Sequence, residues 1–239
     1  MKVMKKFADK QRDIANYPGV TLAFLGDSVT QGCFEPLRKA EDRIEPVFDQ
    51  EQAYHHRLAR MLSVLYPKVP VNIINAGISG DGAPGGLRRV EKDVLRHDPD
   101  LAVVCFGLGD SFGGFEGIDR YVQGLNGIFD KLQDAGIETI FMTPCMTITR
   151  VPYDMTDPLI RKTYQRICDN QNGGVLTAYV NAAKQLCEKR GIRVCDCYAK
   201  WQTLERYGVD ISDHIDGNHP KRYMHELFAV SLLETMLTD

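Results

Sequence analysis

The stretch at residues 23–32 reads AFLGDSVTQG, and it passes from apolar residues directly into Gly26, Asp27 and Ser28. A short apolar run is typical of a buried strand, and a glycine at its end permits a tight turn. Asp27 and Thr30 offer side chains that can satisfy the backbone groups freed at such a turn. The stretch therefore predicts a strand and a sharp turn, with the hydroxyl of Ser28 directly after the strand.

Four other apolar runs have the same character, and longer amphipathic stretches separate them. With TLAFL (21–25) they give five predicted strands: VNIIN (71–75), LAVVCF (101–106), TIFMT (139–143) and IRVCD (192–196). Apolar residues at three- and four-residue spacing predict helices at 52–66, 84–97, 117–135, 175–190 and 220–237. The last of these has Pro220 near its first turn. This alternation predicts an α/β fold, a three-layer α/β/α sandwich around a central, mainly parallel five-stranded sheet.

Length and composition narrow the class of protein. The 239 residues, 44% of them hydrophobic, suffice for a single domain spanning 1–239. The net charge is −3 and no dense Lys/Arg run occurs, so we expect no nucleic-acid partner. No segment has the ~18 apolar residues of a membrane span, and the basic start lacks the apolar stretch of a secretory signal. We therefore expect a cytoplasmic protein.

The seven cysteines have no framework spacing and are expected to be reduced thiols in the core. The close pair Cys195 and Cys197 lacks the second pair and the histidine spacing of a zinc site. We expect it to pack at the end of a strand, with no metal bound.

Sites in parallel sheets form at the carboxyl ends of the strands, so the loops leaving those ends are where chemistry is expected. Two of these loops, 35–50 and 143–158, are long for plain connections. They are candidates for the walls of a substrate cleft, although solvated loops without ligand contacts fit the sequence equally well.

A serine hydroxyl becomes nucleophilic when a base lies within hydrogen-bond reach and a carboxylate orients that base. Near the other end of the chain, HIDGNHPK (214–221) supplies Asp216 and His219 three residues apart. One loop can thus present base and orienting carboxylate together to Ser28. His214 is close enough to line the same loop, and Cys33 and Phe34 follow Ser28 closely enough to touch the site.

In these motifs the sequence resembles the SGNH (GDSL-type) hydrolases, over nearly its whole length. FLGDSVTQG is similar to the block that carries the nucleophile and one oxyanion-hole N–H, which implies those roles for Ser28. NAGISGDGA (75–83) is similar to the block whose glycine gives a second N–H, here Gly80. HIDGNHP is similar to the last block, which implies Asp216 as the orienting carboxylate and His219 as the general base.

The third block of the family departs from this pattern. The family has Gly-x-Asn-Asp, with the Asn side chain as the third oxyanion donor, whereas this chain reads Gly107, Leu108, Gly109 and Asp110. Loss of one such donor commonly costs about 10²- to 10³-fold in rate. Gly109 leaves room for a water or for its own N–H in the oxyanion hole. Ser111, in the second Gly-Asp-Ser, falls beyond the block and is not expected to be a nucleophile.

The resemblance implies a metal- and cofactor-free serine esterase that cleaves a small-molecule carboxylic ester through an acyl-enzyme. Polar loops favour a short acyl group, such as acetyl on a sugar, over the substrates of a lysophospholipase or acyl thioesterase. Because of Gly109, a non-catalytic carbohydrate-binding protein on the same fold is a second interpretation. An α/β-hydrolase is disfavoured because no Gly-x-Ser-x-Gly occurs at either serine. A dinucleotide-binding loop at 107–113 has the wrong spacing.

Overall fold

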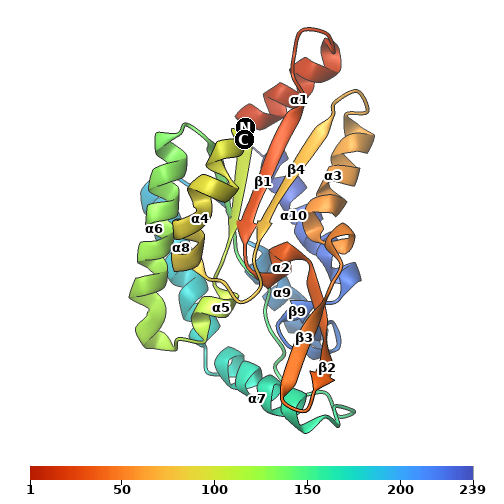
Figure 1. Cartoon of the computed structure of the whole chain (residues 1–239), viewed down its shortest axis with the longest axis vertical. Coiled ribbons are helices and arrows are strands. Elements are labelled where there is room, and N and C mark those ends of the chain that lie inside the picture. The colour runs from red at the N-terminus through yellow and green to blue at the C-terminus, as the bar shows by residue number, and fades with distance from the viewer. Residues whose placement is uncertain (239) are drawn as a thin grey trace.

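A five-stranded sheet runs through the centre of the computed structural model, which describes residues 1–238 (Figure 1). The strand order is β4, β1, β5, β6, β7, and all neighbouring pairs are parallel. The strands are β1 (Val20–Gly26), β4 (Val71–Gly77), β5 (Leu101–Cys105), β6 (Glu138–Met142) and β7 (Arg193–Cys195). The predicted α/β fold with a central parallel sheet is confirmed.

Helices cover both faces of the sheet (Figure 1). In β1, Leu22 and Phe24 point into one core and Ala23 and Leu25 into the other, because successive side chains of a strand alternate between its faces. The first core is closed by α1 (Lys2–Arg12), α3 (Tyr54–Leu65), α9 (Cys197–Arg206) and α10 (His225–Leu237). The second is closed by α4 (Ala83–Asp93), α6 (Ile118–Asp134) and α8 (Val175–Arg190).

Several elements outside the central sheet gather where its strands end. They are α2 (Ser28–Gln31), the antiparallel hairpin of β2 (Cys33–Ala40) and β3 (Arg43–Phe48), α5 (Leu108–Ser111), α7 (Pro158–Asn172), and the small pair β8 (Ile215–Asp216) and β9 (His219–Pro220). Single 3-10 turns lie at Gln50–Gln52, Leu95–His97, Phe115–Gly117, Ile211–Asp213 and Arg222–Met224.

Several elements differ from the sequence prediction. The last helix begins at His225 and not at 220, because Pro220 belongs to β9. Residues 35–50 are largely a hairpin, and α1, α7 and α9 were not predicted. A signal for α7 does exist in the sequence: Asp157 caps its N-terminus by accepting hydrogen bonds from the N–H groups of Leu159 and Ile160, and Pro158 is its first residue.

The two segments predicted as cleft walls lie side by side at the carboxyl end of the sheet (Figure 1). The guanidinium of Arg38 in β2 donates to the carboxylate of Asp157, which precedes α7, at 2.8 Å. The hairpin and the start of α7 are therefore connected by an ion pair. None of the helices formed by residues 1–238 is long and apolar enough to span a bilayer.

Candidate active site

Ser28 is the first residue of α2 and follows β1 almost directly. Oδ1 of Asp27 accepts a hydrogen bond from the N–H of Val29 at 3.0 Å and so caps the helix. The turn packs closely on the neighbouring strand, since a Cβ at Gly77 would lie 2.2 Å from the backbone nitrogen of Gln31. The sequence thus holds Ser28 in a tight turn at the carboxyl end of the sheet, with only 7% of its surface exposed.

His219, on β9, meets Ser28 from the other end of the chain. Its Nε2 lies 2.8 Å from Oγ of Ser28, and its Nδ1 lies 3.0 Å from the main-chain carbonyl oxygen of Phe34. A carbonyl oxygen can only accept, so in this contact Nδ1 carries the proton and Nε2 presents its lone pair to the serine hydroxyl. This is the tautomer that a general base for Ser28 requires.

Burial sets the charge of the groups around this pair. Desolvation lowers the pKa of His219 to about 4, and the hydrogen bond to the Phe34 carbonyl offsets only part of that effect. Desolvation likewise raises the pKa of Asp27 to about 7, against the hydrogen bond from Val29. The imidazole is therefore neutral at physiological pH, ready to accept a proton.

Asp216 is paired with His219 in the register of β8 and β9. Within residues 1–238, however, its carboxylate makes no hydrogen bond with the imidazole, and the partner of Nδ1 is the carbonyl of Phe34. The reason is that β2 begins close after α2 and brings its main chain against the ring, filling the position beside Nδ1. The contact predicted for Asp216 is thus not the one found, and its orienting role stays a prediction.

The three predicted oxyanion-hole residues border one pocket of about 290 Å³, together with His219 and Asn218. Gly80 has φ +79°, which favours glycine, and open space surrounds the position a Cβ would take. In residues 1–238, the N–H groups of Ser28 and Gly80 donate no hydrogen bond to the protein. Both donors border the pocket beside the serine hydroxyl.

Gly109 lies in α5 with an ordinary negative φ. A Cβ added there would lie 3.0 Å from the main-chain oxygen of Asp81, so a side chain would project into the narrow gap between α5 and the loop at 78–82. Glycine leaves this gap open. Residue 109 therefore has no side chain in the place where the resemblance implies that an Asn side chain would lie.

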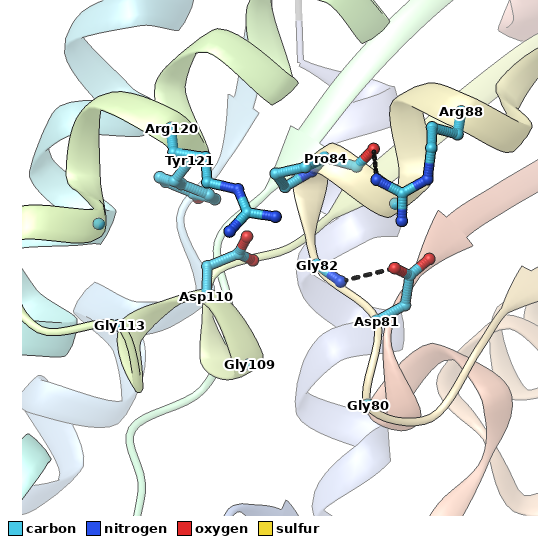
Figure 2. Close-up of a pocket in the computed structure, with 12 residues that line it drawn as sticks. Gly80, Asp81, Gly82, Pro84, Arg88, Gly109, Asp110, Gly113, Arg120 and Tyr121 are labelled. Atoms are coloured by element: carbon cyan, nitrogen blue, oxygen red, sulfur yellow. Dashed lines mark hydrogen bonds between the residues drawn. The ribbon is translucent and has the colours of Figure 1, made fainter.

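A second pocket, of about 390 Å³, adjoins the first and shares Gly80, Asp81 and Gly109 with it. Figure 2 shows Arg120 and Asp110 on one side of this pocket and Arg88 on the other. Oδ1 of Asp110 accepts from the N–H of Ala83 at 2.9 Å, and burial raises the pKa of Asp110 to about 6. The gap at Gly109 thus lies between the pocket that contains Ser28 and His219 and the charged pocket that contains Arg88, Asp110 and Arg120.

Two further residues considered in the sequence analysis, Ser111 and His214, make hydrogen bonds away from the pocket at Ser28. The hydroxyl of the buried Ser111 donates to the carbonyl of Leu108 at 2.8 Å and lies 3.1 Å from Oδ1 of Asn170. Nδ1 of His214 lies 2.9 Å from the hydroxyl of Tyr223. Neither residue borders the pocket at Ser28.

The cysteine pair lies in the core. The sulfurs of Cys195 and Cys197 are 3.7 Å apart, and both residues are buried. Among residues 1–238, no group of three or more His, Cys, Asp or Glu side chains is arranged to hold a metal ion.

Phe34 was expected to touch the site, but two features were not predicted: Asn218 at the pocket and the Phe34 main-chain carbonyl as the acceptor from His219. Asn218 borders the pocket, and its place inside the HIDGNHP motif was a usable signal. The carbonyl of Phe34 carries no such signal, since every residue has a carbonyl. Only the fold shows that the start of β2 reaches the imidazole.

Comparison with known proteins places this chain among hydrolases. The sequence profile of the GDSL-like Lipase/Acylhydrolase family matches residues 24–227. The chain is 29% identical over 224 residues to an acetylxylan esterase of Geobacillus stearothermophilus, covering 90% of this chain and 93% of the relative. It is 26% identical over 121 residues to an arylesterase of Vibrio mimicus, covering 51% and 52% of the two chains.

Solved structures show the same fold. The crystal structure of an acetylxylan esterase from Geobacillus stearothermophilus superposes with a TM-score of 0.67 at 22% identity, over 93% of this chain and 96% of that one. Another acetyl xylan esterase gives a TM-score of 0.65 at 18% identity, over 91% and 100%. At these identities the likeness extends to the fold alone.

Proposed function

The chain belongs to the GDSL-like lipase/acylhydrolase family and is an ester-hydrolysing enzyme, and from that premise we propose that Ser28 and His219 perform the reaction through a covalent acyl-enzyme. The observation that carries the proposal is the 2.8 Å contact between Oγ of Ser28 and Nε2 of His219, at the carboxyl end of the sheet. The accessible pocket beside this contact supports it.

In the first half of the reaction, Oγ of Ser28 attacks the acyl carbon while Nε2 of His219 takes the hydroxyl proton. The N–H groups of Ser28 and Gly80 hydrogen-bond to the oxyanion of the tetrahedral intermediate. His219 then returns the proton to the leaving alcohol oxygen as the ester bond breaks, and the acyl group remains on Ser28.

In the second half, water attacks the acyl carbon and His219 accepts its proton. The intermediate collapses, Oγ of Ser28 leaves and takes the proton back, and the free acid departs. The chain supplies every proton transfer through the one imidazole, whose low pKa keeps it neutral before each attack.

We propose a short acyl group, such as acetyl on a carbohydrate, as the substrate. The modest volume of the pocket at Ser28, about 290 Å³, favours small esters. The named acetylxylan esterase relative, covered over 93% of its length, supports the same class. A screen of p-nitrophenyl acetate, butyrate and longer esters beside acetylated xylo-oligosaccharides and acyl-CoA tests it. Fastest turnover of the long-chain p-nitrophenyl esters or of acyl-CoA would instead support a lysophospholipase or an acyl thioesterase.

The pH dependence follows from the buried imidazole. His219 acts as a base only when neutral, and its pKa is lowered to about 4. We therefore expect kcat/KM to stay high through pH 5 and 6 and to fall as the pH drops through about 4, where an unperturbed histidine would give a fall near ~6.5. Initial rates on p-nitrophenyl acetate from pH 3.5 to 8, with folding checked by circular dichroism, measure this.

Asp27 provides the control for that profile, because its pKa is raised to about 7. An inflection near pH 7 that disappears in Asp27→Asn belongs to Asp27 and leaves the assignment of the lower limb intact. A fall centred near 6.5 that survives in this variant would contradict a desolvated His219.

Gly109→Asn should raise kcat, by up to about 10²-fold, because it restores a side-chain donor for the oxyanion. The gain should appear in kcat more than in KM, since the charge develops in the transition state. The new Cβ lies 3.0 Å from the Asp81 oxygen, so the loop at 78–82 must shift by a few tenths of an ångström. Steady-state kinetics on p-nitrophenyl acetate measure both constants.

Gly109→Ala is the matched control, because it adds the same Cβ without a donor. The ratio of kcat between the Asn and Ala variants isolates the donor from the crowding. Equal kcat values in the two variants would mean that another group already completes the oxyanion hole.

A further inference from the structure

Arg222 lies three residues after His219 and is bound to both ends of the β2–β3 hairpin. Its Nη1 and Nη2 donate to the carboxylate of Glu35 in β2, at 2.7 and 3.3 Å. Its Nε donates to the carboxylate of Asp49, just after β3, at 3.1 Å. One guanidinium therefore connects the loop that carries His219 to both strands of the hairpin.

These bonds surround the residue whose carbonyl accepts from the imidazole. Phe34 directly precedes Glu35, and the Arg222 guanidinium lies over its ring at 4.5 Å from the centroid. The centroid of the Phe34 ring also lies 4.9 Å from the centroid of the His225 ring. The Phe34 side chain is fully buried, so its main chain is held by packing as well as by the neighbouring ion pair.

We infer that the main-chain carbonyl of Phe34 orients the imidazole of His219, and that Arg222 is the positioning residue that holds this carbonyl in place. The inference rests on the proposed Ser28 and His219 chemistry and names the group that serves the base. A fixed acceptor at Nδ1 keeps the proton there, and so keeps the Nε2 lone pair directed at Ser28.

The arrangement differs from a carboxylate-oriented base. A main-chain carbonyl cannot be removed by substitution and carries no full charge, so its effect depends on where the hairpin lies. The Arg222 guanidinium fixes that place with three hydrogen bonds and one ring contact. Arginine suits the task because its planar fork binds a carboxylate with two donors while its face stacks on an aromatic ring.

Arg222→Met is expected to lower kcat by about 10- to 100-fold, the loss typical of a catalytic group displaced by about 1 Å. KM should change by less than about twofold, since no substrate contact is removed. Because the hydrogen bond from Nδ1 to the Phe34 carbonyl raises the pKa of His219, its loss should move the acid limb of kcat/KM below about 4. Arg222→Lys, which keeps the charge without the fork, should restore part of kcat.

Arg190→Met is the matched control. Arg190 joins α8 to α6 through Asp130 at 2.5 Å and Asn126 at 2.8 Å, away from His219. It should leave kcat and the pH profile unchanged. If Arg222→Met leaves both unchanged as well, while Ser28→Ala is inactive, the inference is wrong and the proposed function stands.

Asp216→Asn separates the two possible orienting groups. When a carboxylate orients the base, its Asn variant drops kcat by about 10⁴-fold, through the wrong tautomer. If the Phe34 carbonyl orients the ring, the loss should be about tenfold at most. Nitrogen-15 NMR of the imidazole gives a readout without turnover: Nδ1 should stay protonated in Asp216→Asn and lose that fixed tautomer in Arg222→Met. The reverse pattern would overturn the inference.

Discussion

Ser28→Ala is expected to remove nearly all ester turnover, lowering kcat by about 10⁶-fold, a loss typical of nucleophiles in serine hydrolases. The expectation follows from the position of Oγ, which lies 2.8 Å from Nε2 of His219, the group placed to take its proton. The substitution deletes a single oxygen atom and adds none, and Ser28 is only 7% exposed and does not line the hydrophobic cores, so the fold should persist. Steady-state kinetics and far-UV circular dichroism of the variant measure the two halves of the statement.

Ser111→Ala is the control for this result, because Ser111 lies in the second Gly-Asp-Ser of the chain. Its hydroxyl bonds to Leu108 and lies near Asn170. Loss of that hydroxyl should cost about 1 kcal/mol of the free energy of unfolding and leave kcat near the wild-type value. A fluorophosphonate should label Ser28 in the wild type. An adduct mapped by mass spectrometry to Ser111 would refute the assignment, and no adduct would favour a carbohydrate-binding protein.

His219→Ala is expected to cause a loss of similar size, about 10⁶-fold in kcat. Without the imidazole, the hydroxyl of Ser28 has no base, and the leaving alcohol has no proton donor. The effects of Ser28→Ala and His219→Ala should not add, because each variant already abolishes the step that the pair performs together. The double variant should therefore be no slower than either single variant.

His214→Ala is the matched control in the same loop. Nδ1 of His214 contacts the hydroxyl of Tyr223, and the residue does not border the pocket. The variant should keep near-normal turnover. An inactive His214→Ala together with an active His219→Ala would show that the base had been assigned to the wrong histidine.

Much of the fold could be predicted from the sequence because its apolar residues follow regular periods. The five strands are short apolar runs, and α3, α4, α6 and α8 carry stripes at helical spacing. The hairpin of β2 and β3 could not be recognised, since its outer residues 37–43 are exposed and it has no apolar alternation. The prediction that Pro220 lies near the first turn of the last helix was wrong, because Pro220 belongs to β9 and pairs with Ile215 of β8.

The site, too, could be predicted only in part. Ser28, Gly80 and His219 lie in short motifs whose residue types are chemically informative, and the structure brings all three to one pocket. What the motif could not tell is which group accepts from Nδ1. Asp216 has the right chemistry at the right spacing, whereas Phe34 contributes only its backbone, whose direction depends on the packing of Arg222 and the hairpin.

The β2–β3 hairpin affects how this enzyme is inactivated by heat or denaturant. It is a two-stranded ribbon outside the central sheet, with an exposed outer half, and such elements open locally at a smaller free-energy cost than global unfolding. Opening that also breaks the Arg222 contacts and unpacks Phe34 would withdraw the Phe34 carbonyl from His219 while both hydrophobic cores stay closed. Inactivation by heat or denaturant then begins as a sub-global event, so that catalytic competence reports on the hairpin before it reports on the fold.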